Sequence, residues 1–171
     1  MDAKKANDSL TILTDLVLPG ETNYLDNLFG GELLARMDRA FSIAARRHSR
    51  RIVVTASVNH VAFNKSVPVG SVVILEAKVS RAFNTSMEVR IDVWAENMQQ
   101  VEGKRYCNSA YYTFVAVDQT GRPIPVLDVT PESEREKEFY ESAIRRRELR
   151  LVNAGRMKPE DATHLKKIFL P

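Results

Sequence analysis

The segment from Asp26 to Gly31 places an amide side chain and two glycines directly before a stretch with helical spacing. Glycines let a backbone approach another group closely, and the first N–H groups of a helix have no intrahelical partner. Such a helix start can bind a carbonyl oxygen that is gaining negative charge. Asn27 lies just before it and can both donate and accept hydrogen bonds. The spacing predicts an oxyanion site, although it also fits an ordinary loop and helix cap.

Asp38 is a second candidate because of its position on that helix. On a helical wheel it falls beside Leu34 and Ala45, at the edge of the apolar arc. A carboxylate there costs desolvation unless it has partners, so it is either a boundary residue paired with arginine or a general base or nucleophile at a buried interface. About three helical turns separate it from Asn27. We therefore expect a shared site only if two copies of the chain supply one residue each.

Other residue types that often perform chemistry are less well placed. His48, His60 and His164 lack the spacing of a metal site, and no nucleophile elbow accompanies them. The single cysteine, Cys107, lies in a β-type run and is expected to pack rather than react. Neither a GxGxxG nor a Walker motif occurs. These observations predict a site without a metal or a separate cofactor.

The expected core helix covers residues 32–47, where apolar residues recur at helical spacing. Arg36, Arg39 and Arg46 fall outside the apolar arc, and Ile43 lies on the polar side, where it could contact a partner. The apolar arc itself consists of Leu33, Leu34, Met37, Ala40, Phe41, Ala44 and Ala45.

Strand-like runs flank this helix, in the order strand, helix, four strands. The pattern predicts an α+β fold in which a curved antiparallel sheet wraps around one long helix. A further helix is expected to begin at Thr130-Pro131-Glu132, since an N-cap hydroxyl, a proline and an acid follow one another. A short helix is expected around 159–168. The strand-like runs are 9–17, 52–63, 71–82, 87–95 and 105–117.

The 171 residues suit one domain, which we place at 1–151, with a tail of unknown role at 152–171. One cysteine excludes a disulfide framework, and no apolar run could cross a membrane, so a cytoplasmic location is expected.

The net charge of +3 is a weak excess of positive charge for a chain of this length. The basic residues form three clusters, and each cluster has three possible interpretations. It could be a solvated surface, a site for an anionic small molecule such as a nucleotide phosphate, or, as the third choice, a nucleic-acid surface. These clusters are Arg46 to Arg51, Lys104 with Arg105, and Arg145 to Arg150.

From about Ser9 to Glu138 the sequence resembles the hotdog-fold acyl-CoA thioesterases of the cytosolic acyl-CoA hydrolase group. The resemblance rests on ETNYLDNLFGGELLARMD, VVTASVNHVAFNKSVPVGSVV, NTSMEVRIDVW and KRYCNSAYYTFVAVDQTGRPIPV, in the family's order. It implies the hotdog fold, a long central helix cradled by an antiparallel sheet. It also implies homodimers whose sheets join edge to edge, commonly assembled as trimers of dimers.

The resemblance further implies metal-free hydrolysis of acyl-CoA to a fatty acid and CoA. Asn27 matches the family's motif asparagine and Asp38 its helix aspartate, one from each subunit. The N–H of Gly31, with that of Gly30, would stabilise the oxyanion. The acyl chain would run along the helix between subunits, against Leu33, Met37 and Phe41. The residues matched to CoA phosphate contacts are Asn84, Thr85, Ser86, Lys104 and Arg105.

Three other functions remain open on the sequence. A hotdog protein could bind acyl-CoA without hydrolysing it, although a desolvated carboxylate at Asp38 would then have no use. A hotdog dehydratase usually places a histidine in the reaction, and none lies in the helix start or the loop before it. A nucleic-acid binder would show steeply salt-dependent affinity for DNA or RNA.

Overall fold

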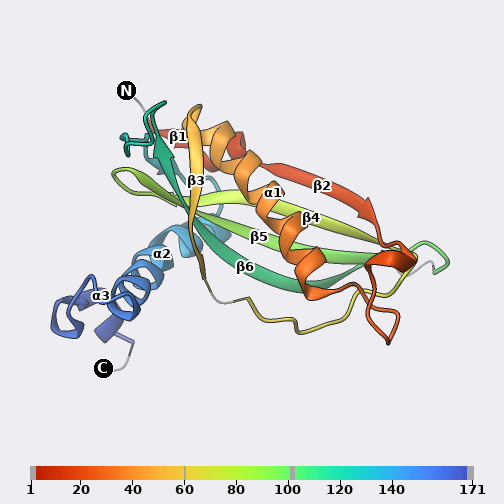
Figure 1. Ribbon diagram of the computed structural model, residues 1–171. Helices are drawn as coiled ribbons and strands as arrows, with labels where there is room; N and C mark the ends of the chain where they lie inside the picture. Colours follow the sequence, from red (N-terminus) through yellow and green to blue (C-terminus); the bar gives the residue numbers. More distant parts are fainter. Residues whose placement is uncertain (1–2, 60, 101–102, 169–171) are drawn as a thin grey trace.

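A five-stranded antiparallel sheet wraps around the long helix α1 (Gly30–Ser49), which crosses one face of the sheet (Figure 1). The computed structural model describes residues 3–59, 61–100 and 103–168. The sheet has the order β2-β4-β5-β6-β3, so β2 and β3 are its edges. The expected α+β fold is confirmed. The strands are β2 (Thr11–Leu16), β3 (Ile52–Asn59), β4 (Ser71–Ala82), β5 (Ser86–Asn97) and β6 (Lys104–Val117).

The core lies between α1 and the concave face of the sheet. The helix buries Met37, Phe41 and their neighbours completely, and the Phe41 ring stacks on Tyr112 with a centroid separation of 4.1 Å. Residues of β4 and β5 alternate between this buried face and an outer face, as the period of two requires. Because α1 is held along its length, side chains on its other sides have fixed positions relative to β3.

Helix α2 (Glu134–Asn153) packs through charged contacts against the outer face of the sheet, near the end where β4 turns into β5 (Figure 1). Arg146 forms two hydrogen bonds to the buried carboxylate of Glu88 on β5, at 2.9 and 2.7 Å, and stacks on Tyr111. Lys78 on β4 pairs with Glu136 at 2.7 Å. Among the described residues, no helix has both the length and the apolar character needed to cross a membrane.

The start of α2 differs from the expectation. Thr130 lies in a short strand β7 (Val129–Thr130), which pairs in parallel with β1 (Lys4–Lys5). The N-cap is Ser133, which accepts a hydrogen bond from the Glu136 N–H in a capping box. The N-terminal segment supplies the strand partner, and local helix-start signals carry no information about so distant a pairing.

The remaining elements are short. The expected strand 52–63 ends earlier, at Asn59, and His60 lies outside the described residues. The expected tail helix is split in two, and Glu148 of α2 holds the second part by accepting from the Leu165 N–H at 2.7 Å. These elements are η1 (Ala6–Ser9), η2 (Pro19–Glu21), η3 (Pro159–Asp161) and α3 (Thr163–Lys166).

Candidate functional site

Asp38 lies near the middle of α1, on the side that faces the edge strand β3. Its Oδ1 accepts a hydrogen bond of 3.1 Å from the Thr55 hydroxyl. Burial raises the pKa of the Tyr112 hydroxyl, and the negative charge of Asp38 raises it further. The Asp38 side chain is exposed in the single subunit. The expected buried interface around it therefore requires something beyond this chain.

Thr55 is a candidate site residue that no pattern in the sequence indicates. It lies next to an irregularity in the pairing of β3 with β6, between Thr55 and Ser57. Threonine is common in strands, so its residue type gave no signal. Only the packing of α1 against β3 shows that its hydroxyl meets Asp38.

The loop before α1 is a tight reversal closed by main-chain hydrogen bonds. Thr22 and Leu28 form an antiparallel bridge, and the Asn23 N–H donates to the Asn27 carbonyl at 2.8 Å. Asp26 takes a positive φ of 54° at the turn. Two large apolar side chains, Tyr24 and Leu25, are exposed at its tip.

The two asparagines of this loop differ in what their side chains can still bind. The Asn23 Oδ1 accepts from the main-chain N–H of Leu25 at 2.9 Å and of Asn27 at 3.3 Å, which fixes the orientation of its amide. Within the described residues its Nδ2 makes no hydrogen bond. The Asn27 Nδ2 instead donates to the Leu25 carbonyl at 2.9 Å. Asn23, which is not adjacent to the glycines and is not among the expected site residues, has the freer donor.

In the described part of the chain, the N–H groups of Gly30 and Gly31 at the start of α1 have no hydrogen-bond partner, as the two glycines suggested. The first helical hydrogen bond runs from the Leu33 N–H to the Phe29 carbonyl, so the N–H groups of Gly30 and Gly31 precede the ladder. A Cβ on Gly31 would meet nothing within 4 Å, whereas one on Gly30 would lie 3.2 Å from the Phe63 ring. Gly30 thus permits the close approach of Phe63, and Gly31 stays open to a ligand.

One subunit does not bring these groups together. Eight residues of α1 separate Gly30 from Asp38, a distance of about 12 Å along the helix axis. Asn27 lies further away, before the helix begins. This separation along α1 agrees with the expectation that Asn27 and Asp38 need not meet within a single subunit, and a site shared between two copies stays a prediction.

Arg36 anchors this loop to α1 and corrects an expectation. The helical pattern predicts Arg36 outside the apolar arc, yet this residue is only 5% exposed. Its guanidinium bonds Asp15 of β2 at 2.9 Å and Glu21 of η2 at 2.7 Å. Burial alone would lower the pKa of Arg36, but the bonds to both carboxylates raise it overall. The carboxylates from β2 and η2 compensate for the cost of burying the Arg36 charge. The spacing of residues along the helix could not predict these partners, because they come from other elements.

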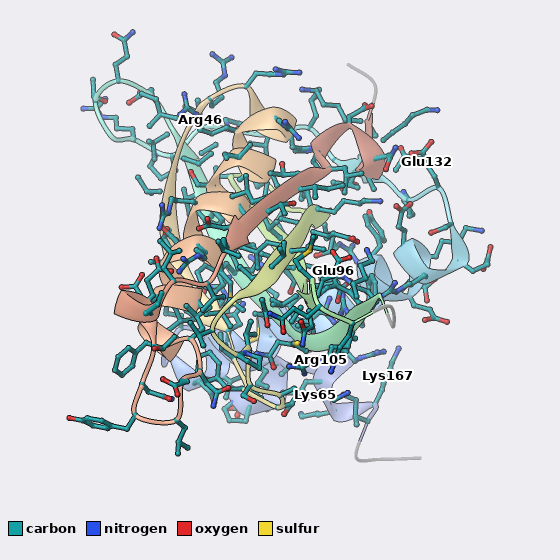
Figure 2. The ribbon with its side chains drawn as sticks, turned by 90° about the vertical axis from the view of Figure 1, so that its right-hand side faces the viewer. Arg46, Lys65, Glu96, Arg105, Glu132 and Lys167 are labelled. Carbon is teal, nitrogen blue, oxygen red and sulfur yellow. The ribbon has the colours of Figure 1, made fainter. Side chains whose placement is uncertain are left out.

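The residues matched to CoA phosphate contacts form two separate groups. Asn84, Thr85 and Ser86 lie at the β4–β5 turn, whereas Lys104 and Arg105 begin β6. Since Arg105 pairs with Ala95, the two groups are about 30 Å apart along β5. Figure 2 shows Arg105 and Lys65 near one end of the molecule and Arg46 at the other. One phosphate cannot contact both groups in one subunit.

The prediction that Leu33, Met37 and Phe41 line the acyl channel between subunits is wrong. Leu33, Met37 and Phe41 are 0–4% exposed, because they point into the concave face of their own sheet. They cannot line a channel between subunits. Large apolar side chains that are exposed near β3 and the start of α1 are Phe29, Ile52, Val54, Val58 and Phe63.

The described residues contain no cluster of three or more histidine, cysteine, aspartate or glutamate side chains that could hold a metal ion. The buried Cys107 has a raised pKa because of its burial, which keeps the thiol protonated and unreactive.

Comparison with known proteins relates the chain to thioesterases. The sequence profile of the thioesterase superfamily matches residues 25–102. A Bacillus subtilis protein named an uncharacterized acyl-CoA thioester hydrolase is 37% identical over 145 residues, which are 85% of this chain and 84% of that protein. The rat cytosolic acyl coenzyme A thioester hydrolase is 32% identical over 154 residues, 89% of this chain but 40% of that longer protein.

Solved structures show the same fold. An apo-hexameric acyl-CoA thioesterase superposes with a TM-score of 0.86 at 39% identity, over 90% of this chain and 98% of the other. The acyl-CoA hydrolase of Staphylococcus aureus, solved with butyryl-CoA, CoA and CoA disulfide, gives 0.84 at 32% identity, over 96% and 98%. Variants of that hydrolase with alanine in place of one aspartate, one threonine or one asparagine have also been solved.

Proposed function

Because the chain belongs to the hotdog-fold acyl-CoA thioesterase family, we propose that it hydrolyses acyl-CoA to a fatty acid and CoA, with Asp38 as general base or nucleophile. The observation that carries this proposal is the contact between Asp38 and Thr55. The Thr55 hydroxyl occupies one carboxylate oxygen and orients the group. The other oxygen is left to take a proton or to attack a carbonyl carbon.

The residues substituted in the Staphylococcus aureus hydrolase support this assignment. Its substituted asparagine, aspartate and threonine are separated by intervals of 15 and 17 positions. In this chain the same intervals around Asp38 fall on Asn23 and Thr55. Asn27 lies four positions after Asn23 and does not fit them. We therefore extend the proposal from Asn27 to Asn23, whose free Nδ2 can donate to the thioester carbonyl or to a water.

The site is proposed to form between two subunits. Strand β3 is an open edge with exposed Val54 and Val58, and an antiparallel pairing with a second β3 would cover it. A two-fold axis there reverses the direction of the second α1, so its N-terminal half would approach Asp38 of the first. Relatives are described as hexameric, and we extend a dimer or a trimer of dimers to this chain. The rat relative is named cytosolic, and we place this protein in the cytoplasm too.

The reaction follows from these groups. Asp38 removes a proton from a water, and the water oxygen bonds to the thioester carbon. The N–H of Gly31, with that of Gly30, donates to the resulting oxyanion, a contact worth about 3 kcal/mol in other enzymes. When the oxyanion collapses, the carbon–sulfur bond breaks, and the departing thiolate receives the proton from Asp38. In direct attack, Asp38 would form an anhydride that water then cleaves, with the same products.

Asp38→Asn tests the proposal. We expect kcat for CoA release from acyl-CoA to fall about 10²–10⁴-fold, because the amide can neither take the proton nor attack. Glu138→Gln removes one exposed negative charge on α2 and serves as the matched control, with activity unchanged. CoA release is followed with a thiol reagent and CoA binding by calorimetry. Wild-type turnover in Asp38→Asn would exclude this role, and a wild type that binds acyl-CoA without releasing CoA would be a non-catalytic binder.

A further inference from the structure

More carboxylates surround the buried Arg36 than its single charge requires. Its guanidinium contacts Asp15 of β2, Glu21 of η2 and, at 3.6 Å, Glu32 of α1 itself. A buried ion pair rarely stabilises a fold more than apolar side chains of similar volume would. The planar guanidinium does provide direction, because its N–H groups point along fixed lines. The geometry that Arg36 imposes on its partners therefore explains its burial better than stability does.

Glu21, one of these partners, lies at the base of the loop that precedes α1. Its Oε1 accepts from the Arg36 Nη2 at 2.7 Å, and its Oε2 accepts from the Leu18 N–H at 3.0 Å. Its main-chain carbonyl accepts from the Phe29 N–H at 2.9 Å, which closes the loop. The Leu18 N–H and the Arg36 guanidinium lower the pKa of Glu21, so the pair is ionised at neutral pH. Glu21 thus connects the helix side chain to both ends of the loop.

The pair of Arg36 and Glu21 is the side-chain connection between this loop and α1. In the described part of the chain, no other side-chain hydrogen bond joins residues 19–28 to the helix. The second arm of the loop is held from outside, by main-chain hydrogen bonds of 2.8 Å to the segment 67–69. The first arm carries Asn23, and its link to the helix is the one that Arg36 makes.

Two donors of the proposed site come from the same subunit, and they lie on different elements. The Asn23 Nδ2 belongs to the loop, and the Gly31 N–H belongs to the start of α1. Both would act on one thioester carbonyl, next to Asp38 of a second subunit. They can converge on that carbonyl only if the loop keeps a fixed place relative to the helix. A displacement of about 1 Å can lower a rate about 100-fold.

We propose that Arg36 is a positioning residue, which holds the loop through Glu21 so that the Asn23 Nδ2 and the Gly31 N–H meet at one carbonyl. This inference rests on the proposed function and adds the part of the fold that fixes one of its donors. Arg36 itself contacts no substrate. It lies about one and a half helical turns after Gly31 and two residues before Asp38. One helix therefore carries an oxyanion donor, the residue that positions the loop, and the carboxylate.

Glu21→Gln and Asp15→Asn each remove one carboxylate from Arg36, but only the first variant alters the link to the loop. Gln has a single acceptor oxygen for the two donors that Glu21 serves, so either Arg36 or the Leu18 N–H loses its partner. We expect kcat for CoA release to fall about tenfold in Glu21→Gln, with KM near wild type. Arg36→Lys, which keeps the charge without the planar fork, should show a similar loss. In Asp15→Asn, the matched control, kcat is expected to stay within about twofold of wild type.

A double-mutant cycle with Asn23→Asp, which removes the Nδ2 donor, separates positioning from a general loss of stability. If Glu21 acts through Asn23, Glu21→Gln lowers kcat by less than about twofold once that donor is absent. A tenfold loss that persists in the Asn23→Asp background would overturn the proposal, because the effect would then not depend on Asn23. Equal losses of kcat in Glu21→Gln and Asp15→Asn would overturn it as well.

Hydrogen exchange of the Leu25 and Asn27 amides measures the order of the loop without any substrate, because both N–H groups bond to the Asn23 Oδ1. We expect both amides to exchange about tenfold faster in Glu21→Gln and at the wild-type rate in Asp15→Asn. A protein that shows this pattern but releases no CoA would refute the proposed function and support the hold of Arg36 on the loop. Unchanged exchange in Glu21→Gln would refute that hold, whatever the activity.

Discussion

At the scale of single residues, hydrogen bonds within the subunit occupy some donors and acceptors of the proposed site, and those bonds determine which groups are left for a substrate. Thr55 donates to one oxygen of Asp38, and main-chain N–H groups occupy the Asn23 Oδ1. Over residues 3–59, 61–100 and 103–168, one carboxylate oxygen of Asp38 and the Asn23 Nδ2 have no hydrogen-bond partner. In the proposed reaction, the carboxylate oxygen activates the water and the amide donor polarises the carbonyl.

The two asparagines can be separated by replacing each with aspartate. Asn23→Asp keeps the oxygen that accepts from Leu25 and Asn27 but removes the Nδ2 donor, so the loop is retained and only the donor is lost. We expect kcat to fall about 10²–10³-fold, as for loss of an oxyanion donor. Asn27→Asp, the matched control, is expected to change kcat only slightly. A larger loss in Asn27→Asp than in Asn23→Asp would return the role to Asn27.

Residue types and spacing alone indicated some of the residues of the proposed site. Asp38 was selected because a carboxylate at the edge of an apolar arc is unusual, and Gly30 and Gly31 because they precede a helix. Thr55 could not be found, since its meeting with Asp38 depends on how α1 packs against β3. The choice of Asn27 over Asn23 relied on position next to the glycines, which says nothing about which amide the loop leaves free.

At the scale of the elements, periodicity predicted which residues α1 buries toward the sheet, but not what its other sides meet. Arg36 is polar and yet buried, because Asp15 and Glu21 come to it from β2 and η2. The acyl channel was misplaced for a related reason: the apolar arc was already covered by the sheet of the same subunit. The start of α2 was misplaced because β1 pairs with β7.

The end of α1 is held by His48, which makes stability depend on pH. Burial lowers the pKa of His48, and its Nε2 contacts the Leu127 carbonyl at 2.7 Å. Its buried Nδ1 has no hydrogen-bond partner among the described residues. The unfolded chain therefore binds the proton more readily than the folded one. The stabilisation is fully present above the ordinary pKa of about 6.5 and is lost as pH falls below it.

Urea unfolding between pH 8 and pH 5 measures this effect. We expect the free energy of unfolding of the wild type to fall with decreasing pH, with a contribution from His48 of at most about 1.4 kcal/mol per pH unit. His48→Gln, which cannot titrate, is expected to be less stable at pH 8 but to lose less on acidification. Parallel curves for the two proteins would show that His48 does not titrate on unfolding in this range.

At the scale of the whole molecule, one subunit keeps the groups of the proposed site apart. The three turns between Asn27 and Asp38 led us to expect a shared site, and Gly30 lies about 12 Å from Asp38 along the helix axis. The edge of β3 offers the surface for a second copy. Its register with that copy depends on contacts between chains, and neither the sequence pattern nor one folded subunit determines it.

A shared site makes a quantitative prediction for mixed assemblies. Asp38→Asn and Asn23→Asp subunits, each nearly inactive alone, are co-expressed with different tags. If each site takes Asp38 from one subunit and Asn23 from the other, a mixed dimer has one intact site and one doubly defective site. Random pairing makes half of the dimers mixed, so roughly a quarter of wild-type turnover should return. A site contained within one subunit would give no recovery above the mean of the two parents, which is the outcome that contradicts sharing.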